Sequence, residues 1–152
     1  MYDNVLFQAV YEQLGCENKT DFINTCRDVY QNEGALSGFS GFITYKETCK
    51  FARENMLLIV DALAQDADER GMSVSQMVAL FKCLDVKNIV GHATYDFERI
   101  FWRVIYDQNN INEEQRDVTR LVLNVLAWWT LEYVAFRVVC EAEYEEQEYR
   151  RQ

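Results

Sequence analysis

The sequence contains no proline and only 6 glycines in 152 residues. These two residues most often end helices and form tight turns, so long helices can run here without interruption. All-β folds need frequent turns, and the residues that form them are scarce. The shortage argues against an all-β fold and predicts an all-α chain.

Histidine is nearly absent as well, since His92 is the single one. An H-E-x-x-H or E-x-x-H site built on two imidazoles is therefore impossible, and we expect His92 to serve a loop or a helix cap. None of the five cysteines forms the C-x-x-C pair of a zinc site. We expect no metal, no cofactor, and reduced, mostly buried thiols at Cys16, Cys26, Cys49, Cys83 and Cys140.

The one glycine-rich stretch, Gly38 to Phe42, does not match a catalytic motif. It misses the G-x-S-x-G nucleophile elbow because Phe42 stands where the second glycine belongs, and it lacks the lysine of a P-loop. We interpret it as a loop in which glycines form the turns and Phe39 and Phe42 plug the core. No catalytic residue is predicted there.

Basic charge is in short supply, because 15 lysines and arginines face 25 acidic residues for a net charge of −10. The charge divides as −4 over residues 1–43, −1 over 44–93 and −5 over 94–152. Such a field disfavours direct binding to nucleic-acid phosphates. Hydrophobic residues make up 49% of the chain, which is enough for a folded core and far above a disordered acidic segment.

The first residues, Met-Tyr-Asp-Asn, show neither the basic nor the apolar region of a signal peptide, so we expect a cytoplasmic protein. The apolar run from Leu121 to Cys140 is long enough to suggest a membrane span. Asn124, Glu132 and Arg137 interrupt it, which favours a buried central helix and no membrane association.

Apolar residues recur at helical spacing through most of the chain and predict one helical domain over residues 1–152, a bundle of five to six helices. The predicted helices cover residues 4–14, 20–32, 44–71, 73–84, 94–106 and 112–149. Thr20 is the predicted N-cap of the second helix, and Gly15 and Gly71 close the first and the third. Ser73 and Gln76 form a capping box on the fourth helix, and Thr130 lies on a polar arc of the last. The last would be about 55 Å long, more than a compact domain of this size spans. Its end must therefore fray, break, or lie against another chain.

The sharpest candidate for a binding surface lies on the predicted helix that begins at Thr94. Tyr95, Arg99, Trp102 and Tyr106 fall within about 60° of its circumference, opposite a second apolar face that runs from Phe97 to Ile105. Tyrosine, tryptophan and arginine are enriched in binding hot spots. Either this helix is sandwiched inside its own domain, or the aromatic face binds a partner.

A second candidate is the acidic tail, residues 141–152, which we expect to be a protruding helix end. It is either a solvated end or an element that enters a basic groove on a partner, where its charge would speed association. The residues we expect to contact a partner there are Glu141, Glu143, Tyr144, Glu145, Glu146 and Glu148.

Glu132 is predicted to point towards the apolar side of the last helix, where a carboxylate needs a partner such as arginine or tyrosine. A catalytic role is disfavoured, since no second acid or histidine is tied to it by spacing. An enzyme assembled from scattered carboxylates such as Glu132, Asp61 and Glu98 remains the least favoured alternative.

Two stretches of the chain carry a resemblance to a known family. The first is Gly38-Phe39-Ser40-Gly41-Phe42-Ile43-Thr44-Tyr45, which leads into Phe51-Ala52-Arg53-Glu54-Asn55, and the second is Leu126-Ala127-Trp128-Trp129-Thr130-Leu131-Glu132-Tyr133-Val134-Ala135. Together they resemble small acidic helical proteins of unknown function encoded by bacteriophages. The resemblance covers about a quarter of the chain. It implies a viral origin and expression in the bacterial cytoplasm, and it supplies no active site. Short acidic phage proteins often disable a host defence, anti-CRISPR proteins among them, which is an analogy only.

These observations favour a non-catalytic inhibitor that occupies a basic nucleic-acid-binding site on a CRISPR effector or another host defence protein. The alternative is a self-associating scaffold or virion accessory protein, in which the last helix and the Trp102 face form a homodimer about a two-fold axis.

Overall fold

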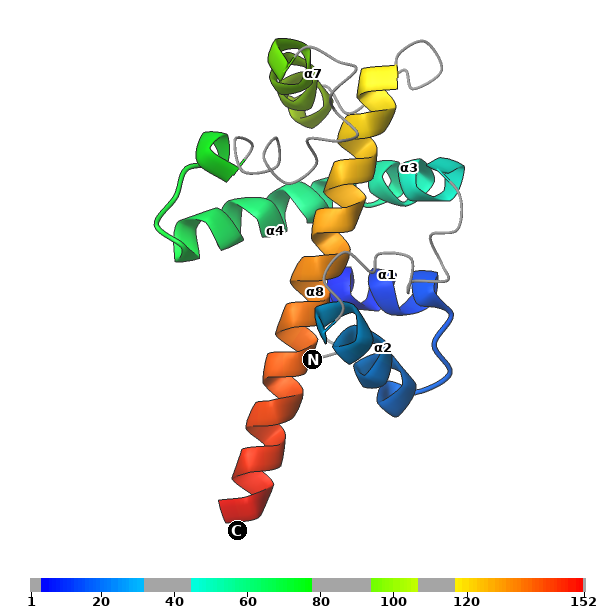
Figure 1. Ribbon diagram of the computed structural model, residues 1–152, viewed down its shortest axis with the longest axis vertical. Coiled ribbons are helices and arrows are strands. Elements are labelled where there is room, and N and C mark those ends of the chain that lie inside the picture. Colours follow the sequence, from blue (N-terminus) through cyan, green and yellow to red (C-terminus); the bar gives the residue numbers. More distant parts are fainter. Residues whose placement is uncertain (1–3, 32–44, 78–93, 107–116, 152) are drawn as a thin grey trace. The chain divides into compact units, whose positions relative to one another are not determined.

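The computed structural model describes residues 4–31, 45–77, 94–106 and 117–151, and all regular structure in these ranges is helical. The helices are α1 (Val5–Leu14), α2 (Lys19–Gln31), α3 (Tyr45–Glu54), α4 (Met56–Glu69), α7 (Thr94–Tyr106) and α8 (Asp117–Arg151) (Figure 1). The all-α prediction, with its long C-terminal helix, is confirmed. The predictions made for the segment Gly38 to Phe42, for Cys83 and for His92 lie outside the described residues.

The chain divides into two compact units, and α8 contributes to both. Unit 1 comprises Met1–Thr48 and Ala127–Gln152, and unit 2 comprises Cys49–Leu126. Each unit has its own buried side chains. The expectation of a single domain over residues 1–152 stays a prediction.

In unit 1, α1 begins at Val5, one residue after the predicted start, and ends at Leu14 as predicted. The Asn4 side chain accepts hydrogen bonds from the backbone N–H groups of Leu6 and Phe7, at 2.9 and 3.2 Å. Gly15 then adopts a left-handed φ of 65° and donates its N–H to the Glu12 carbonyl. Glycine takes up this conformation at little energetic cost, so it ends the helix where other residues would be strained.

The start of α2 differs from the prediction that Thr20 is its N-cap. Asn18 caps the helix, since its side-chain oxygen accepts from the Asp21 N–H at 2.9 Å and its carbonyl from the Phe22 N–H at 3.1 Å. Asparagine and threonine are both good caps, and the two candidates lie only two residues apart. The pattern alone therefore could not choose between them.

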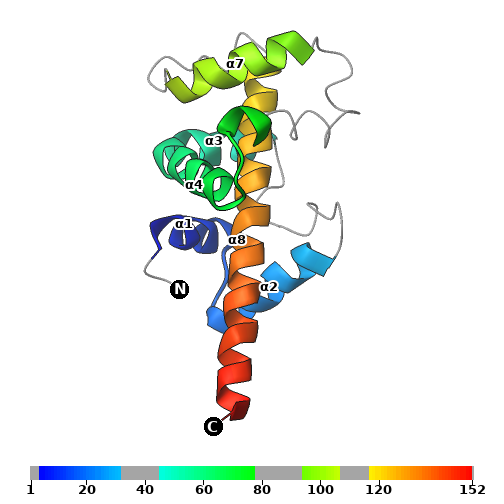
Figure 2. The same ribbon diagram turned by 90° about the vertical axis from the view of Figure 1, so that its left-hand side faces the viewer.

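The core of unit 1 forms where α1 and α2 lie along the C-terminal half of α8 (Figures 1 and 2). The Tyr11 ring meets the Phe22 ring edge to face, with centroids 5.2 Å apart and planes 80° apart, which ties α1 to α2. Thr130, which we predicted on a polar arc of the last helix, is fully buried. The buried apolar side chains of this unit are Leu6, Phe7, Val10, Leu14, Phe22, Cys26, Val29, Ala127, Leu131, Val134, Ala135, Val138 and Val139.

The single helix predicted over residues 44–71 is wrong, because the chain breaks at Asn55 into α3 and α4. The Asn55 side chain donates a hydrogen bond to the Phe51 carbonyl at 2.9 Å, and the Asn55 N–H reaches the same oxygen at 3.1 Å. Asparagine side chains compete in this way with regular backbone bonding. The predicted stop at Gly71 is confirmed, since α4 ends at Glu69 and Gly71 has a φ of 67°.

The core of unit 2 forms where α3, α4 and the N-terminal turns of α8 lie together (Figures 1 and 2). The Cys49 thiol donates to the Arg120 carbonyl at 3.7 Å, which links α3 to α8. The predicted capping box at Ser73 is confirmed, because Ser73 and Gln76 each bond the other's backbone N–H. The buried apolar side chains are Cys49, Phe51, Ala52, Met56, Ile59, Leu63, Ala67, Met77, Phe101, Val104, Ile105, Val122, Leu123, Val125 and Leu126.

The last helix, α8, runs unbroken over 35 residues, a length of about 52 Å. Of the alternatives considered for its excess length, a break is excluded between Asp117 and Arg151. Its final turns extend past α1 and α2 in unit 1 (Figures 1 and 2).

Two arginine–carboxylate pairs, each four residues apart along a helix, show how burial changes the contribution of an ion pair to stability. Arg70 contacts Asp66 at 3.1 Å, and the Asp66 side chain is 8% exposed, whereas Arg150 contacts an exposed Glu146 at 3.0 Å. The second carboxylate oxygen of Asp66 is buried without a hydrogen bond among the described residues. Arg70→Ala should therefore lower the free energy of unfolding by about 1–2 kcal/mol, since it strands a buried charge.

Arg150→Ala is the matched control, and its effect should stay below about 0.5 kcal/mol because exposed pairs contribute little. Urea denaturation followed by circular dichroism measures both variants. Equal effects would contradict the role assigned to burial.

Candidate partner-binding surfaces

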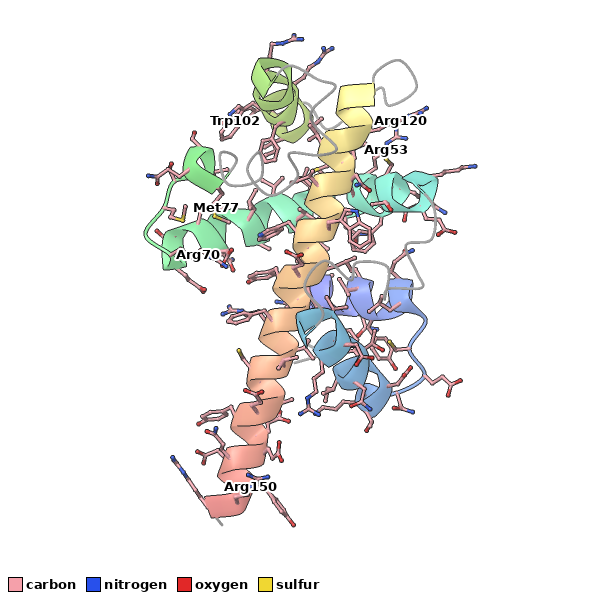
Figure 3. All side chains as sticks on the ribbon, viewed as in Figure 1. Arg53, Arg70, Met77, Trp102, Arg120 and Arg150 are labelled. Atoms are coloured by element: carbon pink, nitrogen blue, oxygen red, sulfur yellow. The ribbon has the colours of Figure 1, made fainter. Side chains whose placement is uncertain are left out.

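One candidate surface lies on α7 in unit 2, and we call Arg99, Trp102 and Tyr106 the α7 aromatic face. The rings of Trp102 and Tyr106 stack with centroids 5.7 Å apart and planes 20° apart, and Tyr106 is 80% exposed. Trp102 is half-buried and meets the buried Phe101 edge to face at 5.8 Å (Figure 3). Arg99 is exposed. The structure thus anchors this face to the core by Phe101 and Trp102 and presents Tyr106 at the surface.

The sequence placed Tyr95 on the same face, and its backbone lies in α7, but its side chain is outside the described residues. On the opposite face, Phe101, Val104 and Ile105 are buried as predicted. The alternative of a helix sandwiched on both faces does not fit Tyr106, whose ring is largely exposed.

A second surface is the acidic segment, Glu141–Glu148, on the last turns of α8 in unit 1. Tyr144 is 64% exposed, and Glu143, Glu145 and Glu146 are exposed, while Glu141 and Glu148 are half-buried. The segment is helical throughout, so its charges are held on a rigid frame.

Basic side chains contact the acidic segment at several points in the part of the chain that the structure describes. Lys19 at the start of α2 lies 3.6 Å from Glu145, and Arg151 lies 3.6 Å from Glu148. Arg150, on the last turns of α8, donates to Glu146 at 3.0 Å (Figure 3). All three pairs are about half exposed or more, so each contributes little to stability and can be exchanged for a partner's cation.

The structure also shows a surface that the sequence analysis missed, the α8 stripe, in unit 1. Trp129 and Tyr133 are half-buried and their rings stack, with centroids 5.0 Å apart and planes 18° apart. The Arg137 guanidinium lies 5.5 Å from the centre of the Tyr133 ring, within cation–π range. The stripe consists of Trp129, Tyr133, Phe136, Cys140 and Tyr144, and the last three are exposed.

These surfaces lie within a region that matches a known family. The family model described as "Domain of unknown function (DUF7222)" matches residues 1–146. The chain belongs to this family. The α7 aromatic face, the α8 stripe and most of the acidic segment therefore fall inside the DUF7222 domain. No curated protein and no solved structure matches the chain.

The α8 stripe was missed because the interrupted apolar run from Leu121 to Cys140 favours a buried central helix. The signal was present in the spacing, since the five stripe residues fall within about 80° of the helix at 100° per residue. The centre of this arc lies opposite the buried arc that contains Leu131 and Val138. Apolar residues on both faces hid the difference between core and surface.

The prediction that Glu132 points towards the apolar side of the last helix is wrong, because its side chain is exposed beside the α8 stripe. Its neighbours still remove part of its hydration, and this burial raises the pKa of the carboxyl group above its ordinary value. Of the other carboxylates considered for an enzyme, Asp61 is exposed on α4 in unit 2, and the Glu98 side chain lies outside the described residues.

Within the ranges that the structure describes, no group of three or more histidine, cysteine, aspartate or glutamate side chains could hold a metal ion. The prediction of mostly buried thiols is confirmed for Cys26 and Cys49 and wrong for Cys140, which is exposed, while Cys16 is half-buried. All four are free thiols. Burial, followed by the charge of Asp21, raises the pKa of Cys16, and a hydrogen bond with Thr25 opposes the rise.

Among the described residues, the helical stretch Val122–Arg151 is long and apolar enough to cross a membrane by length and composition. Its most apolar window is 67% buried inside the protein. Core helices of soluble proteins pass the same test, and the burial of this window fits such a helix.

Proposed function

We propose that the protein is a non-catalytic inhibitor that binds a partner protein through the acidic segment of α8 and blocks a basic nucleic-acid-binding site there. The observation that carries the proposal is the density of charge on a rigid helix. Five glutamates lie between residues 141 and 148, which places one charge about every 2 Å along the helix axis. Duplex DNA carries one charge per roughly 1.7 Å, so a groove that receives phosphates fits this segment.

The charge is also presented in a way that favours association. The segment lies at the end of α8, where its glutamates are exposed or half-buried, and Lys19 holds one side of it through Glu145. An exposed Tyr144 lies among the charges and offers the kind of ring that anchors hot spots. Long-range attraction would speed encounter with a basic partner, and the aromatic ring would slow dissociation.

The partner class follows from the resemblance to small acidic phage-encoded proteins. We propose a bacterial nuclease or CRISPR effector as the target, met in the cytoplasm of the infected cell, and the α7 aromatic face as a second contact. Such a partner handles nucleic acid through a basic channel, which the acidic segment would occupy in place of phosphate.

The test is a pull-down of defence complexes from bacterial lysate at about 50 and 200 mM salt, followed by a nucleic-acid loading assay with the captured complex. We expect capture that weakens about tenfold or more over this range, and loss of nucleic-acid loading. Binding that is insensitive to salt, or a captured complex that still loads nucleic acid, would defeat the proposal.

A charge-matched pair of variants locates the effect. The double variant Glu145→Gln/Glu146→Gln should weaken binding by about tenfold or more, because it removes two charges from the acidic segment. Asp61→Asn/Asp68→Asn removes the same net charge from exposed positions on α4 and should bind nearly as well as the wild type. Equal weakening by both would show that only net charge matters.

A further inference from the structure

The α8 helix in unit 1 has two apolar faces, and only one of them forms the core. Leu131, Val134 and Val138 are at most 1% exposed, while Phe136 and Tyr144 on the stripe are 44% and 64% exposed. At 100° per residue the two arcs are centred on opposite sides of the helix. A soluble protein rarely leaves a row of aromatic side chains at its surface without a use for them.

The charges along the helix decide which way a second α8 can lie against this stripe. The N-terminal half of the α8 stripe, Trp129 to Arg137, carries one acidic and one basic residue and is neutral. The acidic segment, Glu141–Glu148, carries five acidic residues and no basic one. In a parallel pair, the acidic segments of the two chains would lie side by side and repel each other. In an antiparallel pair, each acidic segment faces the neutral half and its Arg137.

We propose that α8 pairs antiparallel with α8 of a second copy of this chain, about a two-fold axis near Cys140. Cys140 lies at the centre of the stripe, and Phe136 and Tyr144 lie one turn to either side of it. The two-fold axis therefore brings Phe136 of each copy level with Tyr144 of the other. The stacked pair of Trp129 and Tyr133 lies level with Gln147 and Arg151 of the second copy.

The edges of the stripe carry opposite charges in this register. In an antiparallel pair, the same edge of each helix meets across the axis. On one edge, Arg137 lies within about two residues, or about 3 Å along the helix axis, of Glu141 of the second copy. On the other edge, Glu132 lies within the same axial distance of Arg150 of the second copy. The acids on the far sides of α8, Glu145 and Glu146, stay outside the contact.

Light scattering and sedimentation test the pairing with two exposed tyrosines on one helix. Tyr144 and Tyr149 are 64% and 81% exposed, but Tyr149 projects from the side opposite the stripe at 100° per residue. We expect a dimer whose dissociation constant rises about tenfold or more in Tyr144→Ala and changes little in Tyr149→Ala. A monomer at every concentration, or equal weakening by the two variants, would overturn the proposal.

Cysteine cross-linking tests the direction. Mild oxidation should join two wild-type chains through Cys140, which is exposed, and Cys140→Ser should remain dimeric without that link. Arg151→Cys in the Cys140→Ser background should not cross-link, because the two sites would lie about 33 Å apart. Efficient cross-linking at position 151 would show a parallel pair and overturn the antiparallel register.

The pairing would cover Tyr144, which the proposed inhibitor function also uses, but the two proposals are tested at different residues. The pairing depends on Tyr144, Phe136 and the position of Cys140, whereas the partner assay changes Glu145 and Glu146. A monomer that still binds its target would contradict the dimer and leave the inhibitor proposal intact. A dimer that binds no target would contradict the inhibitor proposal and leave the dimer intact.

Discussion

Phe22→Ala is expected to lower the free energy of unfolding by about 3–5 kcal/mol, the largest effect we predict for a single truncation. The Phe22 ring is fully buried and meets Tyr11 edge to face, so its removal loses apolar burial and leaves a cavity between α1 and α2. Domains of this size are stable by about 5–15 kcal/mol, so the variant should be close to unfolding. Urea denaturation should show a lower midpoint with an unchanged slope.

Val5→Ala is the control on the same unit, because Val5 is 64% exposed at the start of α1. Its effect should stay within about 0.5 kcal/mol, as expected for a surface substitution. If Phe22→Ala were as mild as Val5→Ala, the packing of α2 against α1 would be wrong.

Much of the fold could be predicted because its helix ends are marked by local chemistry. Gly15, Gly71 and the Ser73–Gln76 box act at the positions where the sequence places them. A cap depends on a few neighbouring backbone groups, so it can be recognised from a few residues. The long last helix follows from a stretch without proline or glycine.

The break at Asn55 could not be predicted, since asparagine occurs inside helices as well as at their ends. What ends α3 is a side-chain bond to the Phe51 carbonyl combined with burial of Phe51 and Met56 on either side. The apolar stripe continues through the break, and periodicity therefore gave no warning. Tertiary packing decides such cases.

Of the candidate surfaces, too, one could be predicted from the sequence and another could not. The α7 aromatic face was predictable because its apolar and aromatic residues fall on opposite sides of one short helix. On α8 the aromatic side chains follow one another among core residues such as Leu131 and Val134, and only the structure separates the two arcs. The exposure of Cys140 and Glu132 was missed for the same reason.

Alkaline pH is expected to destabilise the protein through Cys26. Burial, followed by the charge of Cys16, raises the pKa of Cys26 from its ordinary 9.0 to about 12. The folded protein therefore keeps the thiol protonated where the unfolded chain has lost that proton. The resulting stability is fully present below pH 9.0 and is lost as the pH rises towards 12, by about 1.4 kcal/mol per pH unit from this group alone.

Denaturation midpoints measured from pH 8 to roughly 10.5 reveal this proton, and two variants isolate it. Cys26→Ala removes the titrating group, so its stability should fall less steeply with pH than that of the wild type, by the equivalent of one proton. Val29→Ala also truncates a buried side chain of α2 and should lose stability at every pH while keeping the wild-type slope. An unchanged slope in Cys26→Ala would mean that another group carries the alkaline transition, since the thiol would then titrate alike in the folded and unfolded chains.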